Sequence, residues 1–175
     1  YLDWDTIVIA QWDMLLLTDV DKLLGELQKD EVYLSGLRPV SEVAKWWNWV
    51  KRDTADYELF LQDMHSKFGV SFEPMCCQFI VVCLPKSFLD KYSKYDLELG
   101  FIEYRLPTYA SALGFNFAEC PKIKCFWPSE PSDKIVKANE ISITAQTIPI
   151  GLKTIFLHLF KPSGDRVFHP YYRLF

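Results

Sequence analysis

Gln11, Trp12 and Asp13 are the residues whose types and position best suit chemistry, because they directly follow the apolar run 7–10. A short apolar run without polar alternation predicts a strand that is buried on both faces of a mostly parallel sheet. Such sheets bind ligands just beyond the carboxyl ends of their strands. Asp13 has that position, so the sequence predicts a ligand site at residues 11–13.

A resemblance follows from this segment and its continuation. An apolar strand, the tripeptide Gln11-Trp12-Asp13, four apolar residues and a helix with paired leucines resemble the nucleotide-sugar glycosyltransferases of the GT-A fold. That family carries Asp-x-Asp after the strand, so Gln11 replaces its first acid. The last acid of the family motif binds a divalent metal, and this implies that Asp13 binds one here. The first position contacts ribose or metal-bound water in the family.

The resemblance implies a fold and an activity for the whole chain. The expected fold is α/β, with a mixed, mostly parallel, Rossmann-like central sheet flanked by helices. The expected activity is metal-dependent transfer of a sugar from a nucleotide-sugar donor to a hydroxyl acceptor, such as a glycan or another glycoconjugate. A complete GT-A domain has strands before the acidic motif, so residues 1–175 are expected to form the C-terminal two-thirds of one such domain.

A second acidic tripeptide, Asp19-Val20-Asp21, competes with the first for a metal role. Asp19 or Thr18 can cap the following helix, and Asp21 then lies in the first turn, where the helix dipole favours an anion. The helix start is the preferred interpretation.

Glu103 and Arg105 belong to the segment 100–114, in which Pro107 at the first turn and Gly114 at the C-terminal cap predict a helix. The segment resembles the acceptor-side helix of GT-A enzymes, which an acidic residue precedes. The resemblance implies that Glu103 takes the proton from the acceptor hydroxyl. Alternatively, Glu103 pairs with Arg105 or caps the helix, and both interpretations remain open.

His169, between a phenylalanine and a proline near the end of the chain, resembles the histidine that supplies the second protein ligand to the metal in many GT-A enzymes. With Asp13, diphosphate oxygens and water it would form an octahedral site for Mn2+ or Mg2+. That cation stabilises the charge on the departing nucleoside diphosphate. His158 is explained instead by one face of a strand over residues 156–160.

Basic and aromatic residues complete the predicted substrate site. Arg105 and Lys161 are candidates for phosphate contacts, as are Arg166 and Arg173. Trp12 either lies against the nucleotide or belongs to the core. Gln11 and Asp13 are also placed at the donor.

Two other classes of function stay open. A nucleotidyl or phosphoryl transferase would use the same strand end, but it needs a second carboxylate for a metal pair, where this chain has Gln11. A noncatalytic interaction domain would use Trp46, Trp47 and Trp49 as a binding surface. Exposure of Trp49 with burial of Trp46 would favour that third class.

Composition restricts the remaining possibilities. A chain of 175 residues with 50% hydrophobic content is long enough for one domain with a real core. The net charge of -4 argues against broad nucleic-acid binding. No apolar run approaches the roughly 18 residues of a transmembrane helix.

The five cysteines form an odd set that predicts buried thiols of a reducing compartment. With no Asn-x-Ser/Thr sequence, this predicts a cytoplasmic location. Cys120 and Cys125 could form half of a zinc site, although no second pair with suitable spacing follows.

Hydrophobic spacing predicts the elements that must position these residues. The expected helices cover residues 19–28, 40–50, 57–68 and 88–95, together with the segment that ends at Gly114. The expected strands cover residues 7–10, 31–36, 77–84 and 141–147.

Overall fold

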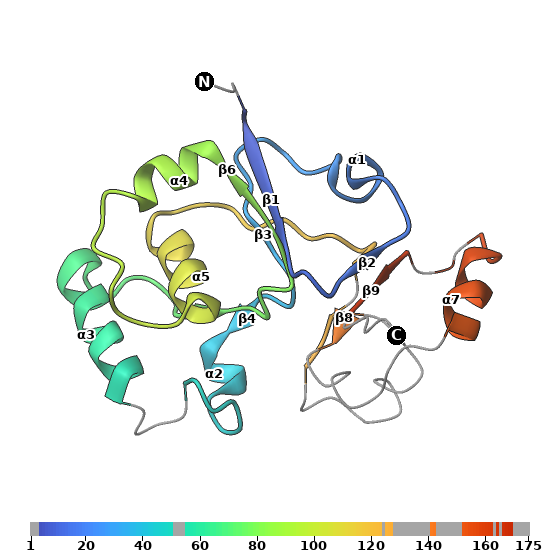
Figure 1. Cartoon of the computed structure of the whole chain (residues 1–175). Coiled ribbons are helices and arrows are strands. Elements are labelled where there is room, and N and C mark those ends of the chain that lie inside the picture. The colour runs from blue at the N-terminus through green and yellow to red at the C-terminus, as the bar shows by residue number, and fades with distance from the viewer. Residues whose placement is uncertain are drawn as a thin grey trace.

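The structure is a computed structural model that describes residues 4–50, 55–123, 125–127, 141–142, 152–162, 164 and 166–169. Its helices and strands, in chain order, are β1 (Thr6–Ala10), β2 (Leu15–Leu16), α1 (Val20–Leu24), β3 (Tyr33–Leu34), β4 (Arg38–Pro39), α2 (Val40–Val43), α3 (Ala55–Phe68), β5 (Met75–Cys76), β6 (Val81–Pro85), α4 (Lys86–Tyr92), α5 (Ile102–Ala112), β7 (Cys125–Phe126), β8 (Ile141–Ser142), α7 (Leu152–Leu159) and β9 (Val167–Phe168). Helices α3, α4 and α5 lie on one side of β1, and β2, β9 and α7 lie on the other (Figure 1).

The central sheet has the strand order β1-β6-β3, and β6 pairs antiparallel with both neighbours. The fold is therefore mixed α/β, as expected, but the expectation of a mostly parallel, Rossmann-like sheet is wrong for the described residues. Their one parallel strand pair is β7 with β8. The apolar character of a short strand does not determine the direction of its neighbour. Since β1 and β3 share a direction, their carboxyl ends reach the same edge, where β6 begins.

Strand β1 is more exposed than its sequence predicts. Ile7, Val8 and Ile9 each keep about two-fifths of their surface exposed, because β1 is an edge strand with β6 as its single partner in the described sheet. Strand β6 lies in the middle and is buried throughout, as residues 77–84 predict for a central strand. The same kind of apolar run thus occupies an edge position in one case and a central position in the other.

The main core lies between β6 and the three helices α3, α4 and α5. Helix α3 buries Phe60 and Met64, and Phe60 contacts the ring of Tyr104 on α5 at 5.1 Å. The predictions of helices at 57–68 and 88–95 are confirmed by α3 and α4, with small shifts at the ends. Helix α1 confirms the helix start after Asp19, although the Asp19 side chain makes no capping hydrogen bond.

The helix predicted over residues 40–50 ends at Val43. The chain continues in turns because Trp46 and Trp47 pack edge-on against the distant Trp127, at 5.8 and 5.2 Å between ring centroids. Trp49 instead contacts Phe101 at 4.4 Å and stays exposed. A contact with a residue so far along the chain overrides the local helical spacing.

The apolar run 155–160 belongs to helix α7, so the strand explanation for His158 is wrong. The run is too short for its spacing to separate a strand from a helix. Arg166 caps the C-terminal end of this helix. Its guanidinium donates hydrogen bonds to the carbonyls of His158 at 2.6 Å and Lys161 at 3.1 Å. Cations at a helix C-terminus compensate its unpaired carbonyls. Of the strand predicted at 141–147, β8 covers the first two residues, and residues 143–147 lie outside the described part.

Candidate functional site

Asp13 and His169, which come from nearly opposite ends of the chain, lie side by side. Their Oδ1 and Nε2 atoms are 3.4 Å apart, and 11% and 5% of the respective side chains are exposed. A carboxylate and an imidazole that are nearly withdrawn from solvent interact more strongly with each other and with an ion than they would at the surface. The structure therefore brings together the two residues that were predicted as protein ligands of a metal.

The pairing of β2 with β9 produces this contact. Leu15 pairs with Phe168 and Leu16 with Val167 in antiparallel register, and continuing that register by one residue places His169 opposite Met14. Asp13 is the residue before Met14. Asp13 thus lies two residues before β2, and His169 directly follows β9.

Backbone hydrogen bonds also fix the turn that follows β1. The Gln11 N–H donates to the carbonyl of Ile80 at 2.9 Å, and the Met14 N–H donates to the carbonyl of Gln11 at 3.3 Å. The first bond ties the turn to the residue before β6. Asp13 is consequently held at the carboxyl end of β1, where the sequence places it.

The separation of 3.4 Å is somewhat longer than the contact expected either for two ligands of one cation or for a direct hydrogen bond. Neighbouring ligands in an octahedral site with bonds of about 2.0–2.1 Å lie about 3 Å apart. A good N–H···O hydrogen bond is shorter, at about 2.7–3.2 Å. Within the described residues no group of three or more His, Cys, Asp or Glu side chains could hold a metal ion. The pair could therefore hold a cation if a bound ligand and water supplied the remaining oxygens.

Ser35 organises the sheet edge on which this turn depends. Its buried Oγ accepts hydrogen bonds from the N–H groups of Ile80 at 3.0 Å and Val81 at 3.1 Å. The residue before Ile80, Phe79, has a φ of +52°, which is rare for a bulky side chain. The same Ile80 receives the Gln11 N–H through its carbonyl, so Ser35 supports the Asp13 turn through one intermediate residue.

A cavity of about 410 Å³ opens beyond the end of β3. Gly36 lines it with a φ of +66°, and an added Cβ would lie 3.1 Å from Trp127 Nε1, which donates to the Gly36 carbonyl. Arg38 also lines the cavity, and its guanidinium lies over the Trp127 ring at 5.1 Å. Sequence reasoning noted the glycine at the end of this predicted strand but did not predict the cavity, whose other wall comes from residues 117–125.

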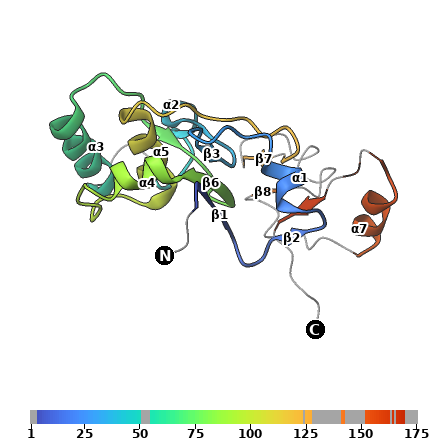
Figure 2. The ribbon, with the colours of Figure 1, turned by 90° about the horizontal axis from the view of Figure 1, so that it is seen from above.

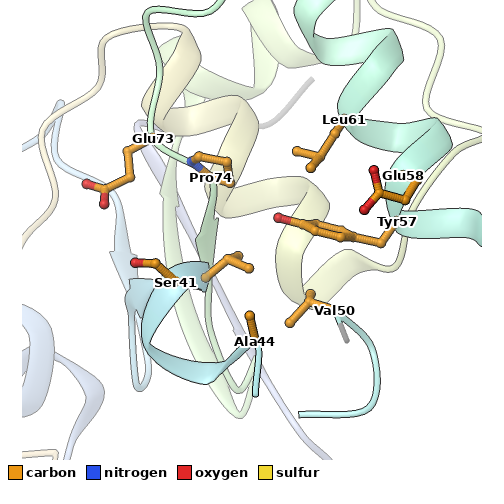
Figure 3. A pocket seen from close by; sticks show the side chains of 9 residues that line it. Ser41, Ala44, Val50, Tyr57, Glu58, Leu61, Glu73 and Pro74 are labelled. Atoms are coloured by element: carbon orange, nitrogen blue, oxygen red, sulfur yellow. The ribbon is translucent and has the colours of Figure 1, made fainter. Parts of the chain in front are cut away.

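A second cavity, of about 280 Å³, lies between α2 and α3 (Figure 3). The Tyr57 ring projects into it, and burial raises the pKa of the Tyr57 hydroxyl, which keeps that group neutral. Glu58 and Glu73 provide carboxylates, and Ser41 adds a hydroxyl. None of the residues that line this cavity belongs to the Asp13 turn or to β9.

Glu103 lies in the first turn of α5 and not before the helix as predicted. Pro107 lies inside the helix and has no N–H, so the carbonyl of Glu103 loses its usual helical donor. That carbonyl accepts the N–H of Cys77 instead, at 2.8 Å. The four residues from 77 to 80 span at most about 14 Å, and they connect this bond to the Gln11–Ile80 bond. Glu103 therefore lies on a separate element that is linked to the same sheet edge.

Two of the basic residues that were predicted to contact phosphate, Arg105 and Arg166, instead donate hydrogen bonds within the protein. Arg105 donates from Nε to the Tyr92 hydroxyl at 3.2 Å and from its guanidinium to the Leu97 carbonyl, so it joins α5 to α4 and the loop between them. Lys161 lies exposed after α7. Arg166 is engaged with carbonyls at the end of α7, and residue 173 lies outside the described part. Among these cations, exposure leaves Lys161 accessible to a ligand.

Trp12 is 89% exposed, so the interpretation of a core tryptophan is wrong. Its indole lies one residue from Asp13, in the turn between β1 and β2. Gln11 is also exposed. The exposed Trp12 ring is a flat apolar surface on the residue that precedes Asp13.

The five cysteines are free thiols, and four of them are buried. Burial raises the pKa of the Cys76 thiol to about 12 and that of Cys120 above its ordinary value. These groups stay protonated at neutral pH and are poor nucleophiles. Cys120 and Cys125 both line the larger cavity, and the described residues around them do not complete a zinc site.

Comparison with known proteins finds no matching family model, no matching curated protein and no matching solved structure. The chemistry of this chain is therefore argued from its own geometry. That geometry contains a nearly buried carboxylate and imidazole and an exposed indole on the residue before Asp13. The cavity beyond β3 is lined by neither Asp13 nor His169.

Proposed function

We propose that this chain is a metal-dependent glycosyltransferase domain that uses a nucleotide-sugar donor and a hydroxyl acceptor. The observation that supports this most is the contact between Asp13 and His169 at the carboxyl end of β1. One carboxylate oxygen and one imidazole nitrogen leave most positions of an octahedral Mn2+ or Mg2+ for oxygens of a diphosphate and for water. Bound there, the cation supplies stabilisation of the charge on the departing diphosphate.

The surrounding side chains would bind the donor and move one proton. The exposed face of Trp12 would lie against the nucleotide, and the Gln11 amide would contact ribose or a metal-bound water. The Glu103 carboxylate would accept the proton of the acceptor hydroxyl as that oxygen attacks the sugar. Because Pro107 frees the Glu103 carbonyl for Cys77, the backbone at Glu103 is tied to the loop that leads to β6.

Thermal unfolding with a panel of nucleoside diphosphates, with and without Mn2+, tests the proposal. A ligand at one hundred times its Kd stabilises the native state by about 2.7 kcal/mol. We expect Mn2+-dependent stabilisation in the wild type and its loss in both Asp13→Ala and His169→Ala. Asp19→Ala is the matched control, because it removes an exposed acid of the rival tripeptide that pairs with Lys22. Stabilisation that persists in Asp13→Ala would contradict the proposed site.

Glu103→Gln tests the base separately. We expect transfer to fall by about a hundredfold to ten-thousandfold while the Mn2+-dependent binding of the nucleoside diphosphate is retained. Equal losses of binding and transfer would assign Glu103 a structural role.

An interaction domain is a second candidate, and the state of Trp49 favours it. Trp49 is exposed and contacts Phe101. Trp47 is buried and Trp46 is half-buried against Trp127, so the criterion of a buried Trp46 is met only in part. The same titration separates the two candidates. If the chain is an interaction domain, no nucleoside diphosphate stabilises the wild type in a Mn2+-dependent way. If it is a glycosyltransferase, the wild type is stabilised, and Trp49→Ala is stabilised to the same extent.

A further inference from the structure

Most apolar side chains of helix α7 are exposed. Ile155 is the exception among those described, because it is buried and packs with Phe168 of β9 and with Leu15 of β2. The exposed large apolar residues of this segment are Leu152, Phe156, Leu157, Leu159 and Phe160. The exposed fraction reaches 61% for Leu152 and 82% for Phe160. Figures 1 and 2 both show α7 at the outer edge of the molecule, beyond β9.

These side chains form one surface. Phe156 and Phe160 stack with their ring centroids 6.3 Å apart, one helical turn from each other. Contiguous exposed apolar surface of this kind marks a site of interaction with a protein or a membrane. Because the helix has eight residues, it is about 12 Å long. No helix in the described part of the chain is long and apolar enough to cross a bilayer, so a membrane contact by α7 would lie in the interface.

The charges around α7 identify the occupant. Lys153 lies near its start and Lys161 just after its end, and residues 152–164 contain no Asp or Glu, the nearest following acid being Asp165. Parallel pairing with a second copy would place Lys153 beside Lys153, and antiparallel pairing would place it beside Lys161. Both arrangements bring like charges together. The complementary partner is apolar in the middle and negative at its rim, which describes the surface of an anionic bilayer.

We propose that α7 is a membrane-surface docking helix that inserts its exposed phenylalanines and leucines into the interface of an anionic bilayer. Lys153 and Lys161 contact the lipid headgroups. The proposal uses the exposure and charge of α7 and does not depend on the glycosyltransferase activity. Its position is relevant to that activity, however. The His158 ring contacts the Phe168 ring at 5.6 Å, and Phe168 directly precedes His169. If both proposals hold, sugar transfer takes place at a membrane surface.

Co-sedimentation of the 175-residue chain with phosphatidylcholine vesicles, with and without phosphatidylserine, tests the docking helix. We expect binding to the vesicles that contain phosphatidylserine. The double variant Phe156→Ser/Phe160→Ser should bind at least about tenfold more weakly. Lys153→Gln and Lys161→Gln should each cost about fivefold, and salt should weaken wild-type binding. Val70→Ser is the control, because Val70 is also 82% exposed but follows α3.

A melting curve separates a loss of membrane binding from a loss of folding in the double variant. Phe156 and Phe160 are exposed, so their replacement should leave thermal unfolding nearly unchanged, which a melting curve checks. Equal vesicle binding by the wild type and the double variant would overturn the proposal. Absence of vesicle binding, with self-association that the double variant loses, would also overturn it and assign α7 to contact with a second copy. A negative result in the Mn2+ titration would leave the vesicle result unaffected, so the two proposals can fail separately.

Discussion

Replacing Ser35 by alanine should destabilise the protein more than any ordinary serine substitution. The Ser35 side chain is fully buried and accepts hydrogen bonds from the N–H groups of Ile80 and Val81. Both of those residues are themselves buried. The Ser35→Ala variant removes the shared acceptor and leaves two backbone donors without it, while the cavity gained is the volume of one oxygen atom.

The magnitude follows from these two donors. A buried donor without a partner costs about 1–3 kcal/mol, so the loss of both bonds should cost about 2–6 kcal/mol. The space gained is too small to admit a water molecule that could replace the hydroxyl. A loss of this size is a large fraction of the 5–15 kcal/mol that stabilises a typical domain.

Urea unfolding followed by tryptophan fluorescence measures this change. Ser41→Ala is the matched control, because Ser41 lies exposed at the rim of the smaller cavity (Figure 3) and its replacement should change the free energy of unfolding by less than about 0.5 kcal/mol. A loss below about 1 kcal/mol in Ser35→Ala, with an unchanged m-value, would contradict this prediction. It would show that other groups satisfy the two N–H donors.

Three further predictions concern the exposed indole, a helix end and the thiols. Trp12→Ala should change the free energy of urea unfolding by less than about 0.5 kcal/mol, since Trp12 is exposed; a loss of several kcal/mol would place it in a core. Gly114→Ala should lower the free energy of unfolding by about 1 kcal/mol in the same assay. Gly114 has a φ of +75°, which an alanine disfavours, and an added Cβ would meet no atom within 4 Å, so the cost is one of backbone conformation alone. An unchanged free energy of unfolding would contradict this. Burial raises the pKa of Cys76 from 9.0 to about 12, so its contribution to stability is fully present below pH 9 and falls by about 1.4 kcal/mol per pH unit between the two values. Cys76→Ala should make the pH profile of unfolding less steep above pH 9, and an unchanged slope would contradict this.

The sequence predicted correctly those helices whose ends depend on residues within or next to the helix itself. Gly114 ends α5 as predicted, because the Gly114 N–H donates to the Ser111 carbonyl and the Phe115 N–H donates to the Ala110 carbonyl. This is the hydrogen-bond pattern that a glycine beyond the helix end permits. Helix α3 likewise forms where the spacing predicts it, and Phe60 and Met64 lie on its buried face. Leu59, which the same spacing assigns to that face, is exposed.

Predictions failed where distant contacts decide the structure. The tryptophans after Val43 leave the helix because they pack on Trp127, and that contact has no trace in the local spacing. Pro107 lies in the middle of α5 because Cys77 replaces its missing N–H as the donor to the Glu103 carbonyl. The direction of β6 relative to β1 is set by the whole path of the chain between them, through α2 and α3.

The contact between Asp13 and His169 forms although the central sheet is antiparallel. It requires the turn after β1, which the Gln11–Ile80 hydrogen bond ties to the start of β6, and a short antiparallel pairing of β2 with β9. The two side chains therefore meet here without the parallel sheet that the sequence suggested. For the same reason, their contact gives no support to a GT-A topology, and their role in binding a metal stays a prediction. What the contact does supply is a specific pair whose removal, one residue at a time, must abolish Mn2+-dependent nucleotide binding if the proposed chemistry is right.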